Sequence, residues 1–150
     1  MIKGKFLTGT LMGFVVLLIS AQLFAQADVI EKRQTLMKSN SADAKAIKAA
    51  VEKKDYASVE AKAKDIMGNA DKIVAAFPKG STAGKTKAKP EIWEKSDAFS
   101  KNAKNLAKAA SELADAAKAG DEAAVTAKVK ALGDVCTSCH KAFRAEKYSE

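Results

Sequence analysis

Histidine, proline and aromatic residues are scarce in this 150-residue chain, which has one histidine, two prolines and 6% aromatic residues. A single histidine cannot complete a structural zinc site of the Cys₂His₂ type. It also leaves no second imidazole for acid–base catalysis or for a nucleophile set. We therefore do not expect an enzyme.

The chain also lacks a sustained alternation of apolar and polar residues, the pattern of a half-buried strand. Apolar residues instead recur every three or four positions, which predicts four amphipathic helices. Their inward stripes are Ile30, Arg33, Met37, Asn40, Ala44, Ile47 and Val51; Val59, Ala63, Ile66, Ala70, Ile73 and Phe77; Phe99, Ala103, Leu106, Ala110, Leu113 and Ala117; and Val125, Val129, Leu132, Cys136, Cys139 and Phe143. The predicted fold is all-α, an antiparallel up-and-down four-helix bundle.

Breaker and capping residues set the expected helix boundaries. Residues 78–93, rich in lysine and in helix breakers, predict one long loop. Ser96 or Asp97 is expected to cap the third helix, Gly120 to end it, and Asp121 to cap the fourth. These breaks limit the helices to bundle length, which disfavours the alternative of an extended coiled coil.

The amino-terminal segment has the pattern of a secretory signal peptide, with Lys3 and Lys5 before an apolar stretch over residues 6–19. Small residues then precede an expected cleavage after Ala27, with Ala25 as the alternative. A membrane anchor is the rival interpretation, but the apolar run is short for a span of about 20 residues. We expect no transmembrane anchor after processing.

Residues 28–150 are predicted to form one domain, because the remaining length suits a single core. Removal of the signal peptide takes away Lys3 and Lys5 but no acidic residue, so the formal charge falls from +8 to +6. A basic surface favours acidic protein partners or anionic membranes, although a solvated lysine-rich surface is an equal alternative. Nucleic acid is not an expected partner of an exported protein.

The motif that carries chemistry is Cys136-Thr137-Ser138-Cys139-His140, the pattern for attachment of c-type haem. Residues three and four apart share a helix face, so both sulfurs can reach the two vinyl groups of one porphyrin while His140 ligates the iron. A thioredoxin-like redox pair is the alternative, but that motif accompanies strands, which this sequence does not predict. We therefore expect one haem c, bound covalently through both cysteines.

Alanine dominates the inward stripes. Burial of apolar surface contributes about 25 cal/mol per Å², and each alanine buries little such surface. A haem between the helices would supply the missing bulk. The simpler explanation is that alanine favours helix.

Three segments resemble the class II cytochromes c, which include cytochrome c prime. They are Arg33-Gln34-Thr35-Leu36-Met37, residues 86–93, and Cys136 to Arg144 near the carboxyl end. The resemblance covers essentially the whole mature chain. It implies a periplasmic protein with His140 as proximal ligand, and frequently a homodimer built on the first two helices.

The resemblance also implies a set of residues around the haem. Arg33 and Gln34 would lie near the haem edge, and Thr86 and Lys87 would pass by a propionate. Arg33 stands four residues before Met37 and hence on the same helix face, so it can reach a propionate if Met37 lies over the iron. A solvated arginine at a helix edge is the alternative.

Met37 is the expected distal residue and the expected second iron ligand. After signal removal only Met37 and Met67 remain as methionines, no second histidine exists, and lysine amines are protonated near neutral pH. Met37 lies on the inward stripe, whereas Met67 lies beside the stripe of its helix. The alternatives are an apolar shield over a five-coordinate iron and a flexible core filler.

Two functions follow from these expectations. The first is a single-electron carrier between redox partner proteins that the sequence does not identify. The second is a five-coordinate haem protein that binds nitric oxide or carbon monoxide at an open distal face.

Overall fold

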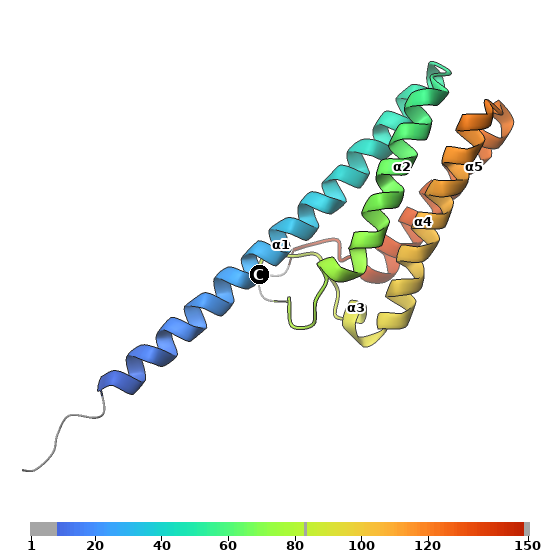
Figure 1. Cartoon of the computed structure of the whole chain (residues 1–150). Helices are drawn as coiled ribbons and strands as arrows, with labels where there is room; N and C mark the ends of the chain where they lie inside the picture. The colour runs from blue at the N-terminus through green and yellow to red at the C-terminus, as the bar shows by residue number, and fades with distance from the viewer. Residues whose placement is uncertain (1–8, 83, 149–150) are drawn as a thin grey trace, which may run out of the picture.

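A computed structural model describes residues 9–82 and 84–148, with side chains described from residue 27 onward. Four long helices, α1 (Gly9–Glu52), α2 (Tyr56–Ile73), α4 (Ser96–Ala119) and α5 (Glu122–Phe143), form an antiparallel up-and-down bundle (Figure 1). Two short helices, η1 (Val74–Ala76) and α3 (Glu91–Glu94), lie in the connection between α2 and α4. The predicted fold class is confirmed.

Side-chain caps and one glycine define several helix ends, of which the Asp121 cap and the Gly120 stop were predicted. The Asp55 carboxylate accepts from the Ser58 amide at the start of α2, and the Asp121 carboxylate accepts from the Ala124 amide at the start of α5. Gly120 ends α4 in the left-handed region at φ 69°, a conformation that glycine adopts without a Cβ penalty.

The predicted cap of α4 is wrong by one residue. Lys95 occupies the cap position and its side chain makes no capping bond, so α4 already includes Ser96 and Asp97. The reason is the short helix α3, which the sequence analysis missed. The Lys95 amide also donates a hydrogen bond to the Glu91 carbonyl and so ends α3, and the chain turns directly from one helix into the next.

Helix α1 begins upstream of the expected mature domain and runs without interruption past Ala27. It contains no proline, so nothing in its sequence forces a break. The signal-peptide prediction falls partly on residues 1–8, which lie outside the described residues, and it stays a prediction. Within the described part of the chain, no helix is long and apolar enough to span a membrane.

The bundle is closed on three sides and loose on the fourth. Helix α2 packs against both α1 and α4, and α4 packs against α5, whereas α1 and α5 make few contacts (Figure 1). The inward stripes of α2 and α4 are buried almost throughout, as Val59, Ile66 and Leu113 show at 0–1% exposure. The middle of the stripe on α1 and much of that on α5 is only half buried, namely Met37, Asn40 and Ala44, and Val129, Cys136 and Cys139.

Candidate haem-binding site

The two cysteines lie one turn apart on the inward face of α5, where both are half buried and pack against the hydrophobic core. The intervening Thr137 and Ser138 are exposed, and their hydroxyls donate to the carbonyls of Gly133 and Val135 in the preceding turn. His140 follows Cys139 directly and remains exposed. One helix therefore presents two thiols and one imidazole within two turns.

The surroundings favour the neutral forms of all three groups. Burial raises the pKa of the Cys136 thiol, and burial together with the neighbouring Cys136 raises the pKa of Cys139. Desolvation, and secondarily the positive charge of Arg144, lowers the pKa of His140. Both effects favour the neutral imidazole, which is the form that ligates a metal.

The end of α5 is fixed to the long connection between α2 and α4. The Lys89 amide donates to the Phe143 carbonyl at 3.0 Å, and the Ala145 amide donates to the Lys87 carbonyl at 2.8 Å. Phe143 is 5% exposed and stacks edge-on against Phe99, with ring centroids 5.2 Å apart. Residues 85–89 are therefore held beside the haem motif.

Arg33 is the most informative residue of α1, because it is only 2% exposed. One guanidinium nitrogen donates to the carbonyl and hydroxyl of Ser81 at 2.9 and 3.0 Å, and the other donates to the Thr86 hydroxyl at 2.7 Å. The guanidinium also lies 5.0 Å from the centroid of the Phe77 ring. A solvated arginine at a helix edge does not describe this residue.

No carboxylate of the described residues pairs with Arg33. Burial lowers the pKa of its guanidinium, which reflects the cost of placing this charge away from water. Neutral oxygens solvate the cation but do not neutralise it. A haem propionate would supply the missing counter-charge.

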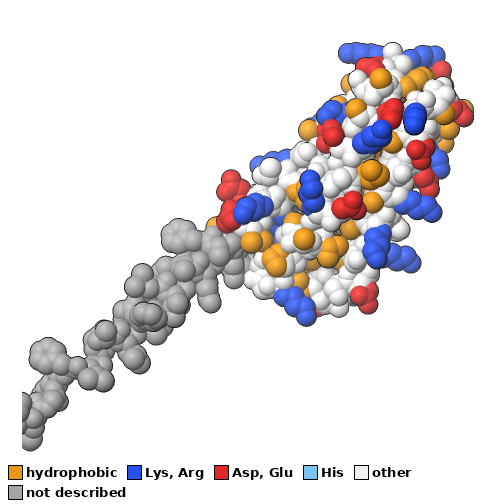
Figure 2. Space-filling view, in the orientation of Figure 1, with side chains coloured by type: hydrophobic (Ala, Val, Ile, Leu, Met, Phe, Trp, Pro, Cys, Tyr) orange, Lys and Arg blue, Asp and Glu red, His pale blue; other side chains and the backbone are white. Residues whose placement is uncertain are grey.

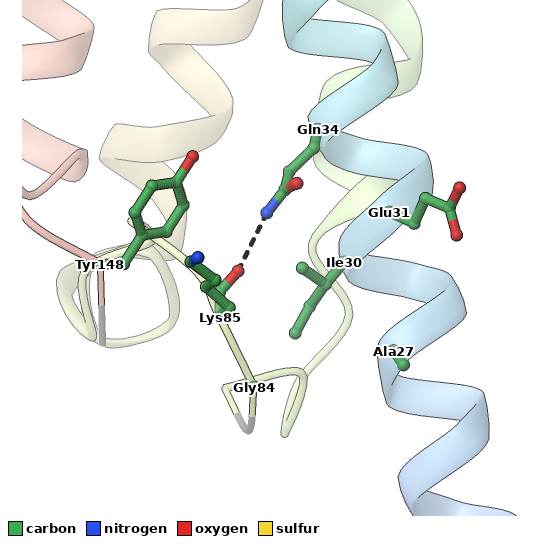
Figure 3. Close-up of a pocket in the computed structure, with 7 residues that line it drawn as sticks. All are labelled: Ala27, Ile30, Glu31, Gln34, Gly84, Lys85 and Tyr148. Atoms are coloured by element: carbon green, nitrogen blue, oxygen red, sulfur yellow. Dashed lines mark hydrogen bonds between the residues drawn. The ribbon is translucent and has the colours of Figure 1, made fainter. Parts of the chain in front are cut away.

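Gln34, Thr86 and Lys87 also gather at this end of the bundle. The Gln34 amide donates to the Lys85 carbonyl at 2.9 Å, and both residues line an open pocket of about 440 Å³ (Figure 3). Thr86 is buried, and its hydroxyl accepts the hydrogen bond from the Arg33 guanidinium. The Lys87 ammonium donates to the Glu146 carbonyl at 2.7 Å and lies 4.8 Å from the Tyr148 ring.

Sequence reasoning did not find Ser81, Phe77 or Tyr148 as part of this region. Phe77 was visible as a stripe residue, but its contact with Arg33 was not. The contacts of Ser81 with Arg33 and of Tyr148 with Lys87 join residues 48 or more positions apart, so no local pattern marks them.

Met37 lies one turn after Arg33 on α1, is half buried, and packs against the hydrophobic core. Its helix and α5 flank the loose side of the bundle. Met67 on α2 is also half buried, but α2 is enclosed between α1 and α4. Contact of Met37 with iron stays a prediction.

The residues present fit a c-type haem. Two thiols share one helix face, an imidazole follows them, the inward surface of α1 and α5 is half covered, and the buried Arg33 has no anionic partner among the described residues. The bound haem supplies a one-electron ferric–ferrous couple. The chain holds the porphyrin through Cys136 and Cys139.

Comparison with known proteins agrees with this geometry. Residues 28–144 match the family model described as Cytochrome C'. Cytochrome c' of Rhodospirillum rubrum is 41% identical over 131 residues, covering 84% of this chain and 88% of that protein.

Solved structures show the same architecture. Cytochrome c' from Thermochromatium tepidum superposes with a TM-score of 0.74 at 30% identity, covering 81% of this chain and 97% of the other. A nitric oxide complex of a cytochrome c' variant from Alcaligenes xylosoxidans gives a TM-score of 0.73 at 26% identity, with coverage of 81% and 97%. The chain belongs to the cytochrome c' family and carries haem c covalently through Cys136 and Cys139.

Proposed function

We propose that this protein is a periplasmic, non-enzymatic carrier of single electrons, with His140 and Met37 as the two axial ligands of the haem iron. The observation that carries the proposal is the position of Met37. It lies one turn from the buried Arg33, on a half-buried stretch of α1 that borders the loose side of the bundle opposite α5. Two axial ligands keep the coordination of the iron unchanged between its redox states, which suits electron transfer.

Each protein group has a defined task in this proposal. Cys136 and Cys139 fix the porphyrin to α5, and the lowered pKa of His140 keeps its imidazole available to the iron. Arg33 neutralises a propionate, with Gln34, Thr86 and Lys87 grouped nearby. A thioether ligand from Met37 raises the reduction potential.

A second candidate function is the binding of nitric oxide or carbon monoxide. It is favoured by the family, because a cytochrome c' variant from Alcaligenes xylosoxidans has been solved as a nitric oxide complex. In that case Met37 shields an open distal face instead of ligating the iron. The two functions therefore differ in a single bond to one sulfur.

The periplasmic location is supported by the amino-terminal pattern, with Lys3 and Lys5 before an apolar run. The family match begins at residue 28, directly after the expected cleavage site at Ala27. A homodimer through α1 and α2 is also part of the proposal. A solved cytochrome c' relative is described as showing ligand-controlled dimer dissociation.

Absorption spectra of the purified holoprotein test the axial ligation. Wild type should be low-spin, show the ferric charge-transfer band of methionine ligation near the red edge of the visible spectrum, and resist carbon monoxide. Met37→Ala should lose this band and bind carbon monoxide. Met67→Ala, the matched control on α2, should keep the wild-type spectrum.

A wild-type protein that is high-spin and binds carbon monoxide readily would contradict Met37 ligation and favour the gas-binding function. His140→Ala tests the proximal ligand separately. It should retain covalent haem on a denaturing gel, because the thioethers do not involve histidine, but its spin state should change.

A further inference from the structure

Most of the net positive charge lies in two short segments that are far apart in sequence. Residues 85–89 and 141–148 contain six basic residues and one acidic residue, which gives five of the chain's eight net positive charges. We call these six residues the cationic ladder: Lys85, Lys87, Lys89, Lys141, Arg144 and Lys147.

Main-chain pairing brings the two segments together. Ala88 and Arg144 form an antiparallel β-bridge. It is flanked by two main-chain hydrogen bonds, from the Lys89 amide to the Phe143 carbonyl and from the Ala145 amide to the Lys87 carbonyl. The two basic segments therefore run side by side in opposite directions. Repulsion among clustered like charges opposes such an arrangement, and the fold nevertheless holds it in place.

The ladder combines clustered positive charge with a lack of ion pairs among the described residues. None of its six side chains pairs with a carboxylate of the described residues. Elsewhere on the surface some lysines, such as Lys54 and Lys128, are paired, and others, such as Lys101 and Lys104, are not. The bundle face seen in Figure 2 accordingly shows basic and acidic side chains interspersed. What sets the ladder apart is that its unpaired cations are grouped in two adjoining segments.

Several of these cations are also held in position. The Lys87 ammonium donates to the Glu146 carbonyl, and the Lys89 ammonium donates to the Lys141 carbonyl at 3.0 Å near the end of α5. Lys85 and Lys87 both lie over the Tyr148 ring, at 5.4 and 4.8 Å. A binding surface gains affinity when its charges are ordered before the partner arrives.

We propose that the cationic ladder is the docking surface for an acidic protein, which under the proposed function is the redox partner. The second segment of the ladder begins at Lys141, the residue after His140, and includes Arg144 one turn further, so a protein docked here lies beside the haem motif. A cluster of carboxylates complements the ladder and accelerates productive encounter. A membrane is less well matched, because Tyr148 is the only large exposed apolar side chain described in either segment and its ring already contacts two lysines.

The test compares two double charge reversals in the holoprotein. Lys85→Glu with Lys147→Glu changes the ladder, and Lys101→Glu with Lys104→Glu makes the same charge change on exposed positions of α4. Calorimetric titration with poly-L-glutamate measures binding directly. Poly-L-glutamate affinity should fall about tenfold in the ladder variant and less than twofold in the control.

Electron transfer gives an independent readout. The anion hexacyanoferrate(III) takes one electron from the reduced protein and becomes hexacyanoferrate(II). The cation tris(phenanthroline)cobalt(III) also takes one electron and becomes the cobalt(II) complex. The ladder variant should react about tenfold more slowly with the anion and faster with the cation. The control should keep the wild-type ratio of the two rates.

Equal losses in both double variants would overturn the ladder as a specific surface. Loss of binding to phosphatidylglycerol vesicles in the ladder variant, with poly-L-glutamate binding unchanged, would also overturn it in favour of a membrane. Failure of the proposed function looks different, because wild type would then exchange electrons slowly with both reagents.

Discussion

The two halves of the bundle are built differently. Helices α2 and α4 bury their inward stripes almost completely, with Val59, Ala110 and Leu113 at 0% exposure. Helices α1 and α5 carry the residues assigned to haem, and in the middle of α1 and along much of α5 their stripes are half buried. Side-chain packing alone thus completes the α2–α4 half, whereas the α1–α5 half offers apolar surface that the haem can cover.

This difference shows how a small, alanine-rich protein can combine stability with a large cofactor. Ala63, Ala110 and their neighbours let α2 and α4 approach closely and form a rigid support. The cofactor-binding groups then stand on elements attached to that support. The Phe77, Phe99 and Phe143 rings link the two halves, with successive centroids 5.1 and 5.2 Å apart.

Removing the thioether bonds should break the α1–α5 half most completely. In Cys136→Ala with Cys139→Ala, haem should be extracted entirely by acidified organic solvent, because nothing covalent then holds it. Wild-type protein retains its haem under the same treatment and serves as the control. Haem that still migrated with the double variant on a denaturing gel would contradict attachment through these sulfurs.

The haem-free form of that double variant should separate the two halves in stability. A ligand bound only by the native state stabilises that state, so its removal should lower the melting temperature and leave the protein partly unfolded. Amide hydrogen exchange should then be fastest in α1 and α5 and slowest in α2 and α4. Equal helicity and equal melting temperature with and without haem would refute this prediction.

A large part of this architecture follows from local sequence patterns. The four stripes, the Asp121 cap and the left-handed Gly120 each depend on residues within a few positions of one another. The haem motif is equally local, since three residues within five positions specify its chemistry. These features were predictable because one helix turn suffices to define them.

The unpredicted features depend on contacts between distant segments. The bonds from Arg33 to Ser81 and Thr86 span 48 and 53 residues, and the pairing of residues 87–89 with 143–145 spans more than 50. No periodicity marks such contacts. The family resemblance placed Arg33 and residues 86–87 around the same haem, but only the fold shows that the loop contacts and buries the arginine.

A core truncation in the α2–α4 half should cost stability and leave the haem unaffected. Leu113→Ala removes a side chain with 0% exposure and should lower the free energy of unfolding by about 3 kcal/mol. Leu36→Ala, the matched change at a half-buried position of α1, should cost less than half as much. Denaturant unfolding of both holoproteins measures the difference, and equal losses would contradict the contrast between the halves.

The smallest expected effect concerns the cap of α2, which belongs to the fully packed half. Hydrogen bonds from the Ser58 hydroxyl and amide lower the pKa of Asp55 below its ordinary value. A carboxyl group whose folded-state pKa is lowered stabilises the fold above its unfolded pKa of about 3.9, and this contribution is lost as pH falls through the folded-state value.

Wild type should therefore be more stable than Asp55→Asn at pH 7, and the two should converge as the pH is lowered below about 4. Urea unfolding of both holoproteins at pH 7, 5 and 3 measures this difference, and taking the difference cancels acid effects on the haem that the two proteins share. The absorption spectrum should stay the same in both proteins at pH 7, since Asp55 lies at the start of α2 and outside the α1–α5 half. A stability difference that stays constant from pH 7 to pH 3 would show that the Asp55 charge contributes nothing to the cap.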